Sequence, residues 1–168
     1  MDIVQFYRGE IPNNEGNFID EILSWSFDRL EMDHSYIQWL FPLEEKSNFN
    51  IDAPILTTND IKEFRKDVIL QEKFLFSFHK ILLFFGFVLE GNNIRVQIDG
   101  EYHKDAKWLF RGFNHNMLRI TRVLRSLYLL EQEELSKKFL EVLRNYRDCV
   151  SENTWNFWES AIVEPTNN

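Results

Sequence analysis

The chain has 168 residues, of which 44% are hydrophobic and 27% are charged, a composition typical of one globular domain and unlike that of a disordered chain. Its formal net charge of −8 disfavours nucleic acid and anionic membrane surfaces as partners, because both attract positively charged proteins. The single cysteine cannot form an internal disulfide, and no apolar stretch reaches the roughly 20 residues that cross a bilayer. We therefore expect a soluble, cytoplasmic domain at residues 1–164, with at most peripheral membrane association and a frayed tail at 165–168.

The N-terminal third predicts a first amphipathic helix at residues 18–32. Apolar residues recur there at helical spacing, and Asn17 precedes them as a candidate N-cap. Residues 1–60 carry twelve acidic side chains and only three basic ones. This acidic region must either be exposed or meet the basic residues of the C-terminal half.

A short second helix is predicted at residues 36–41. Ser35 followed by Gln38 matches a capping box, and Pro42 disfavours helix at the residue before it. The aromatic rings of this helix are expected to enter the core. Residues 43–56 show no hydrophobic period, and we expect a long loop there.

The strongest helical pattern runs through the centre of the chain. Thr57 and Asp60 form a capping signal, and the apolar residues after them follow a seven-residue repeat as far as Phe85. The second half of this segment is apolar on nearly every side, so we expect neighbouring elements to cover it all round. The predicted fold is therefore mainly α, a single-domain helical bundle around a long central helix at 61–85.

Gly86 is a natural end for the central helix, and a small β-hairpin is predicted after it. The segments 87–90 and 94–98 have the composition of strands, and Gly91-Asn92-Asn93 between them is a credible turn. Because each strand is short, the hairpin would be a minor part of a helical protein.

The C-terminal part predicts further helices. A short one begins at Lys104, a stronger one spans about 116–130, and another covers 135–146. The acidic stretch 131–134 is either the tight link of an αα-hairpin or the middle of one bent helix, because no glycine or proline enforces a turn there. Ser151 can cap a last helix.

None of the common catalytic motifs is present. The sequence contains no GxxxxGK[ST], GxGxxG or GxSxG pattern, and its four histidines lack the spacing of metal ligands. Asp33, His34 and Ser35 are the residue types of a catalytic triad, but consecutive side chains point in different directions, and the capping role explains Ser35. We therefore expect no cofactor, no metal and no catalytic residue.

A stripe of basic residues is the clearest candidate for binding. Arg119, Arg122 and Arg125 recur every third residue of one predicted helix, and His115 lies one turn before Arg119. Guanidinium groups suit bidentate capture of a carboxylate or phosphate. The alternative, which we favour, is that these arginines pair internally with acids of the N-terminal region.

Two blocks of sequence resemble the conserved region of the opioid growth factor receptor family. The first is HSYIQWLFP at 34–42, preceded by FYR and FIDEIL. The second is NHN at 114–116, followed in the same order by LRITR and LRSL. The resemblance implies a receptor-like domain, since vertebrate members are known as receptors for an enkephalin-type peptide and are associated with the nucleus and perinuclear membranes. The sequence ends soon after the second block and carries no nuclear-import signal, so a stand-alone cytoplasmic domain is expected.

Two functions of different classes fit these observations. The first is a peptide- or protein-binding domain in which Tyr36 and Trp39 offer aromatic contacts, His34 contacts the ligand, and the arginines hold a carboxylate. The alternative is an enzyme acting on a phosphate-bearing or nucleotide substrate, with His34 or His115 as acid–base and the arginines as an anion clamp. Because no catalytic motif requires the second function, we expect the first.

Overall fold

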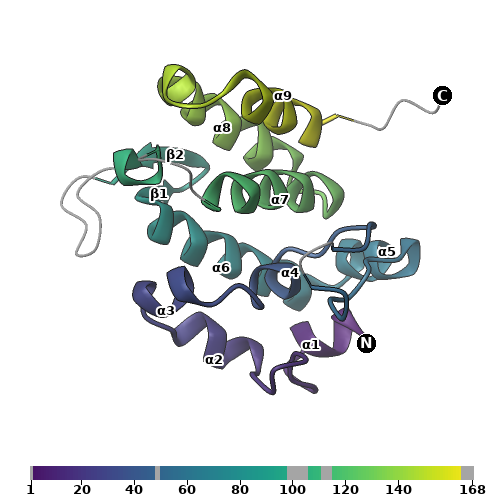
Figure 1. The fold of residues 1–168 in the computed structure, drawn as a ribbon. Coiled ribbons are helices and arrows are strands. Elements are labelled where there is room, and N and C mark those ends of the chain that lie inside the picture. The colour runs from purple at the N-terminus through teal and green to yellow at the C-terminus, as the bar shows by residue number, and fades with distance from the viewer. Residues whose placement is uncertain (1, 48–49, 98–105, 111–114, 164–168) are drawn as a thin grey trace. The chain divides into compact units, whose positions relative to one another are not determined.

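The computed structural model describes residues 2–47, 50–97, 106–110 and 115–163, and helices dominate them (Figure 1). Its internal contacts divide the chain into two compact units, Met1–Phe84 and Phe85–Asn168. The prediction of a mainly α-helical fold with one small hairpin is confirmed. Whether 1–164 behaves as one domain is not tested by this division and stays a prediction. Within the described part of the chain, no helix has the length and apolar character needed to span a membrane.

The first unit is built from short helices grouped with one long helix. Its elements are α1 (Ile3–Tyr7), α2 (Ile19–Ser24), α3 (Phe27–Met32), α4 (Ile37–Leu40), α5 (Thr58–Lys66) and α6 (Val68–Phe85). Lys80 Nζ donates to the Trp25 carbonyl at 2.7 Å, and the rings of Phe27 and Phe84 lie 5.9 Å apart. These contacts hold the region between α2 and α3, and α3 itself, against α6, whose buried aromatic face forms the core of this unit.

The predicted single helix at 18–32 is wrong, because the structure breaks it at Trp25 and Ser26 into α2 and α3. The Ser26 hydroxyl accepts a hydrogen bond from the Arg29 backbone N–H at 3.3 Å and starts the second helix. The N-cap of α2 is Phe18, whose N–H donates to Glu21 Oε2 at 2.7 Å. The predicted N-cap at Asn17 is therefore wrong. The side chain of Glu21 accepts the hydrogen bond of a backbone N–H at the start of α2.

The short helix α4 forms where it was predicted, but the capping box at Ser35 is wrong. The N–H and the hydroxyl of Ser35 both donate to Asp33 Oδ1 at 2.7 Å, and α4 begins without a side-chain cap. The expected burial of the aromatic rings is confirmed, since Tyr36, Trp39 and Phe41 have no exposed surface. Burial against neighbouring helices thus stabilises a helix too short to be stable alone.

The central segment begins with the predicted capping box. Asp60 Oδ2 accepts from the Thr57 N–H at 2.8 Å, and Thr57 Oγ1 accepts from the Asp60 N–H at 3.2 Å. The single long helix, however, is wrong, because Asp67 is extended (φ −98°, ψ 105°) and separates α5 from α6. Its Oδ1 accepts from the Ile69 N–H at 2.9 Å, which is a new helix start.

The expected coverage of the second half of the central segment on all sides is wrong at one position, because Phe76 is the only exposed apolar residue among those that the structure describes there. Val68, Ile69 and Phe76 of α6 are 69%, 64% and 57% exposed. On the opposite side of the helix, Phe74 and Phe78 are fully buried. The helix therefore has one buried aromatic face and one exposed face on which Val68, Ile69 and Phe76 flank the charged Glu72.

The second unit contains the hairpin and the remaining helices. Its elements are β1 (Phe87–Glu90), β2 (Asn93–Val96), the 3₁₀ helices η1 (Ala106–Phe110) and η2 (Arg144–Cys149), and the α-helices α7 (Asn116–Leu129), α8 (Glu133–Leu143) and α9 (Glu152–Ala161). The hairpin is confirmed, with Phe87 opposite Val96 and Glu90 opposite Asn93. Gly91 takes φ +60° in the two-residue turn, a conformation that glycine adopts readily. The predicted helix start at Lys104 and the tail at 165–168 lie outside the described residues.

The link between α7 and α8 is a tight turn, so the αα-hairpin is confirmed over the bent helix. The Gln132 N–H donates to the Leu127 carbonyl at 2.8 Å, and Glu131 between the two helices has φ +65°. This is the geometry of a helix end that usually contains glycine. Ser136 of α8 then donates to the Leu124 carbonyl at 2.7 Å and joins the two helices.

The left-handed conformation of Glu131 gives a testable prediction. A side chain costs about 1–2 kcal/mol in this conformation, whereas glycine adopts it without strain. We expect Glu131→Gly to have a free energy of unfolding about 1 kcal/mol higher than Glu131→Ala, measured by urea denaturation. Both variants lack the carboxylate, so equal stabilities would show that the backbone at this turn is unstrained.

Aromatic packing around Phe139 of α8 forms the core of the second unit. Its ring centroid lies 6.5 Å from that of Phe85 and 5.6 Å from that of Phe87, and all three are fully buried. The predicted cap of α9 is confirmed, since Ser151 Oγ accepts from the Thr154 N–H at 3.1 Å. These contacts tie α8 to the start of the hairpin.

Candidate functional site

The three predicted ligand contacts of the first unit differ in their exposure to solvent. His34 is exposed, whereas Tyr36 and Trp39 are fully buried. Trp39 Nε1 donates to Asn14 Oδ1 at 2.8 Å, and its ring lies 4.9 Å from that of Phe6. Tyr36 and Trp39 therefore contribute to the core in this structure and present no surface to a ligand.

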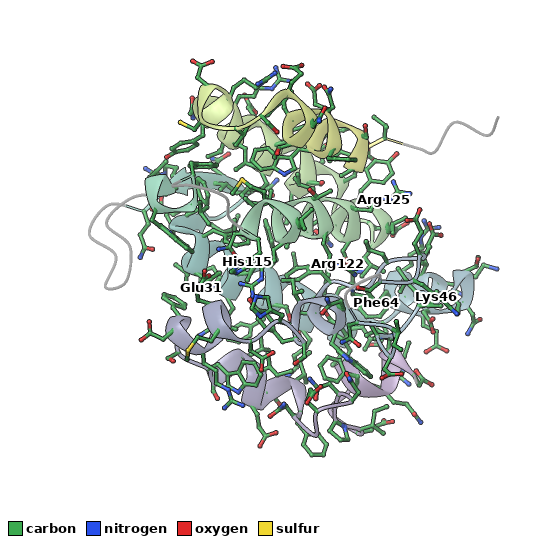
Figure 2. All side chains as sticks on the ribbon, in the orientation of Figure 1. Glu31, Lys46, Phe64, His115, Arg122 and Arg125 are labelled. Carbon is green, nitrogen blue, oxygen red and sulfur yellow. The ribbon has the colours of Figure 1, made fainter. Side chains whose placement is uncertain are left out.

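The predicted basic stripe lies on α7 of the second unit. Figure 2 shows His115 at the start of the helix and Arg125 near its end, with Arg122 between them. Arg119 is 4% exposed, and its Nη1 donates to Asn116 Oδ1 at 3.0 Å. The stripe is thus not uniformly exposed, because Arg119 is almost fully buried.

The other two arginines of the stripe are half-buried. Arg125 Nη1 donates to the Val163 carbonyl at 2.9 Å, which ties α7 to the end of α9. Among the residues that the structure describes, no group of histidine, cysteine and acidic side chains is arranged to hold a metal ion. The ability of Arg122 and Arg125 to bind an anion stays a prediction.

A shallow, open groove of the first unit brings together charged and apolar side chains that the sequence did not single out. Its volume is about 680 Å³. Its walls come from the end of α1, from α5 and from the start of α6. The lining residues are Arg8, Asn59, Lys62, Glu63, Lys66, Asp67, Val68 and Ile69. We call this surface the Arg8 groove.

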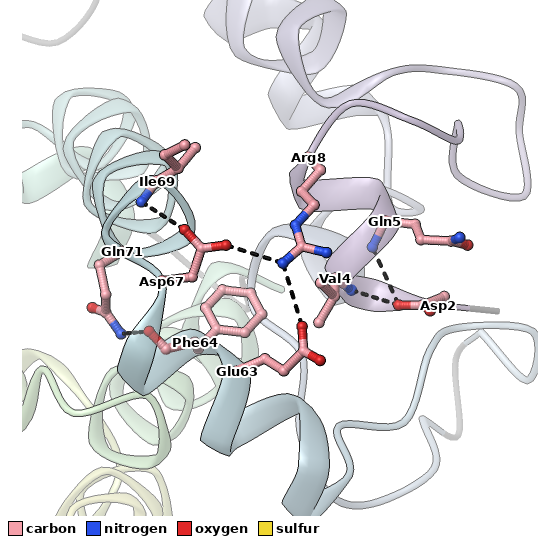
Figure 3. Close-up of polar contacts among 9 residues, drawn as sticks. All are labelled: Asp2, Val4, Gln5, Arg8, Glu63, Phe64, Asp67, Ile69 and Gln71. Carbon is pink, nitrogen blue, oxygen red and sulfur yellow. Dashed lines mark hydrogen bonds and ion pairs between the residues drawn. The ribbon is translucent and has the colours of Figure 1, made fainter.

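Arg8 joins the walls of the groove (Figure 3). Its Nη2 donates to Asp67 Oδ2 at 3.0 Å and to Glu63 Oε2 at 3.4 Å. The hydrogen bond with Asp67 raises the pKa of Arg8 and lowers the pKa of Asp67. Because the other oxygen of Asp67 accepts from the Ile69 N–H, one carboxylate both starts α6 and anchors α1. Asp67 therefore links α1 to the break between α5 and α6 at the floor of the groove.

The two acidic side chains of the groove form ion pairs with Arg8, whereas its two lysines form none with a described residue. Lys62 and Lys66 are exposed, lie one turn apart on α5 and make no ion pair with any residue that the structure describes. Val68 and Ile69 continue the same surface onto α6 and are mostly exposed. Arg8, Lys62 and Lys66 carry three positive charges against the two negative charges of Glu63 and Asp67, so the lining has a small net positive charge beside its exposed apolar residues.

The ion pair of Asp67 predicts a pH dependence of stability. Because the folded pKa of Asp67 lies below its usual value of 3.8, its contribution to stability is present above about pH 4 and is lost as the pH falls through the folded pKa. We expect the free energy of unfolding to fall less between pH 4 and pH 2 in Asp67→Asn than in the unmodified chain, measured by urea denaturation at each pH. The exposed acid Asp148, changed to Asn, is the control, and an unchanged slope in Asp67→Asn would contradict the ion pair.

One local signal could have revealed part of the Arg8 groove. Asp67 directly precedes the apolar run that begins at Val68, which is an N-cap pattern inside a longer apolar repeat. Its partner Arg8 is far away in the sequence, and no spacing rule connects the two. The groove is thus a product of tertiary structure.

The chain matches a known protein family over nearly its whole length. The model of the opioid growth factor receptor (OGFr) conserved region matches residues 1–164. The opioid growth factor receptor-like protein 1 of Mus musculus is 36% identical over 164 residues, which cover 95% of this chain and 34% of that protein. The opioid growth factor receptor of Homo sapiens is 40% identical over 134 residues, which cover 74% of this chain and 19% of that receptor.

The matched region is only part of each relative. The chain spans about a third of the length of the receptor-like proteins and less of the receptors themselves. No solved structure matches the chain. The match of the family model to nearly every residue confirms the resemblance seen in the blocks at 34–42 and 114–116. The chain belongs to the opioid growth factor receptor family.

Proposed function

We propose that this chain is a peptide- or protein-binding domain, receptor-like as its family is, and that it catalyses no reaction. The Arg8 groove is the observation that carries this proposal. Sites for small molecules are usually enclosed and bury most of the ligand, whereas an open groove between helices suits a peptide segment or a helix of a partner. Exposed apolar residues beside uncommitted positive charges are also typical of a binding surface.

Neighbouring contacts support a rigid groove. Arg8 fixes the end of α1 against Glu63 and Asp67, and Phe64 beneath them is fully buried against Tyr7, with ring centroids 4.9 Å apart. A site on rigid elements loses little conformational entropy when it binds. The lining residues thus lie on elements that are packed together, which suits a site that changes little when a partner binds.

The proposal is tested by selecting peptides from an unbiased display library on the full chain. The opioid growth factor, named by the relatives, is assayed beside them as a defined peptide. We expect selected peptides to bind with a measurable Kd in calorimetry and to lose at least about tenfold in affinity to Val68→Asp. Met32→Asp is the matched control, because Met32 is also exposed and lies in the same unit.

The outcomes of this test separate the groove from other surfaces. Peptides that bind the chain and the Val68→Asp variant equally would contradict the groove as the binding site. If Arg122→Ala abolishes binding and Val68→Asp does not, the binding site lies on α7. Tight binding of a phosphate-bearing probe at that helix, followed by its turnover, would favour the alternative of an enzyme using His115 and the arginines.

A further inference from the structure

We propose that the Arg8 groove, continued along the exposed face of α6, binds an amphipathic helix of a partner protein that carries acidic residues at one end and apolar residues along one side. This inference rests on the proposed binding function and specifies the chemistry of the partner.

The apolar residues of α6 lie on one face of the helix. Positions 68, 72 and 76 are one turn apart, so Val68 and Phe76 lie on the same side with Ile69 beside them, about 12 Å from end to end. All three apolar side chains are more than half exposed. A partner helix presents its own apolar residues at the same spacing, so two helices can bury this stripe against each other.

Lys62 and Lys66, at the α5 end of the stripe, favour a partner with acidic side chains there. Asp60 accepts hydrogen bonds from Thr57 in the capping box, and Glu63 and Asp67 are held by Arg8. Lys62 and Lys66 make no ion pair with a described residue, although Glu63 and Asp67 line the same groove. Carboxylates of a partner would supply the missing counter-charges at this end of the stripe.

Glu72 limits where those carboxylates can lie. It is exposed on the same face, between Val68 and Phe76, and no contact with another described residue compensates its charge. An acidic side chain placed opposite Glu72 would be repelled. The partner is therefore expected to carry its acids over Lys62 and Lys66 and neutral or basic residues over the middle of α6.

A second copy of this chain is a poorer occupant than an acidic partner helix. In a two-fold dimer through the stripe, each copy offers one carboxylate from the stripe, Glu72, to the two lysines of the other copy, whereas an acidic partner helix can place a carboxylate over each lysine. Self-association through the stripe is therefore an outcome that would overturn the proposal.

The test uses a fluorescently labelled amphipathic peptide with glutamates in its first turns and leucines one turn apart after them. Matched peptides carry glutamine or lysine in place of the glutamates. We expect the glutamate peptide to bind the full chain most tightly in fluorescence anisotropy, with an affinity that falls as the salt concentration rises. Lys66→Glu and Phe76→Ala should each weaken binding about tenfold, the first by repulsion and the second by loss of apolar contact.

Lys46→Glu is the matched control for charge, because Lys46 is exposed in the same unit and the substitution changes the net charge equally. It is expected to leave the affinity unchanged. Equal binding of the glutamate and lysine peptides, or no effect of Lys66→Glu, would overturn the inference. If the glutamine peptide binds as tightly as the glutamate one and Phe76→Ala still weakens it, the groove remains a binding site while the acidic partner is excluded. A dimer in sedimentation that Phe76→Ala dissociates would assign the stripe to a second copy.

Discussion

Trp39→Ala is expected to lower the free energy of unfolding by about 3–5 kcal/mol, the usual cost of removing a large buried ring. Trp39 has no exposed surface, packs against Phe6 and donates from its Nε1 to Asn14 Oδ1. The substitution removes these contacts and leaves an apolar cavity beside an unsatisfied acceptor. Urea denaturation followed by circular dichroism measures the loss, and Trp39→Phe should retain much of the stability because the ring is kept.

The control for Trp39 is Phe157→Ala, since Phe157 of α9 is 61% exposed. Exposed substitutions of this kind usually change stability by less than about 0.5 kcal/mol. A Trp39→Ala variant as stable as Phe157→Ala would contradict the buried position of Trp39. It would also restore Trp39 as a residue available to contact a ligand, as the sequence suggested.

Phe139→Ala is expected to lower the free energy of unfolding by a similar amount, about 3–5 kcal/mol. Phe139 is fully buried between the rings of Phe85 and Phe87. The loss is expected within a single cooperative transition, because α6 runs without a break across the boundary between the two units, from Val68 to Phe85. Thermal unfolding recorded by calorimetry measures both the loss and the number of transitions.

This measurement also tests the prediction of a single domain at 1–164. If the units unfold together, Phe139→Ala and Trp39→Ala each shift one common transition to lower temperature. Two transitions, of which each variant shifts only one, would show that Met1–Phe84 and Phe85–Asn168 fold independently. The predicted single domain would then be wrong.

Local patterns predicted those elements whose stabilising contacts are local. The capping box of Thr57 and Asp60 and the cap at Ser151 involve residues three apart, and both were found as expected. The break at Asp67 was missed because the apolar repeat continues across it, so the period alone favoured one helix. Sequence periodicity reports which residues share a face but not where a long helix is interrupted.

The candidate site was predicted less well than the fold because exposure depends on tertiary structure. Phe74 and Phe76 are equally apolar in sequence, yet one is fully buried and the other is mostly exposed. The burial of Trp39 and Arg119 and the pairing of Arg8 with Asp67 likewise depend on elements that are distant in the chain. The sequence blocks did identify the family, since that inference requires only matching residues and not their positions in space.

The most direct test of the proposed binding function is an amide chemical-shift map of the isotopically labelled full chain, titrated with a peptide selected on it. We expect the largest shift changes at the residues of the Arg8 groove, from Asn59 to Ile69, and along α6 as far as Phe76. Shift changes confined to α7, at Arg119 to Arg125, would contradict the groove and assign binding to the basic stripe instead.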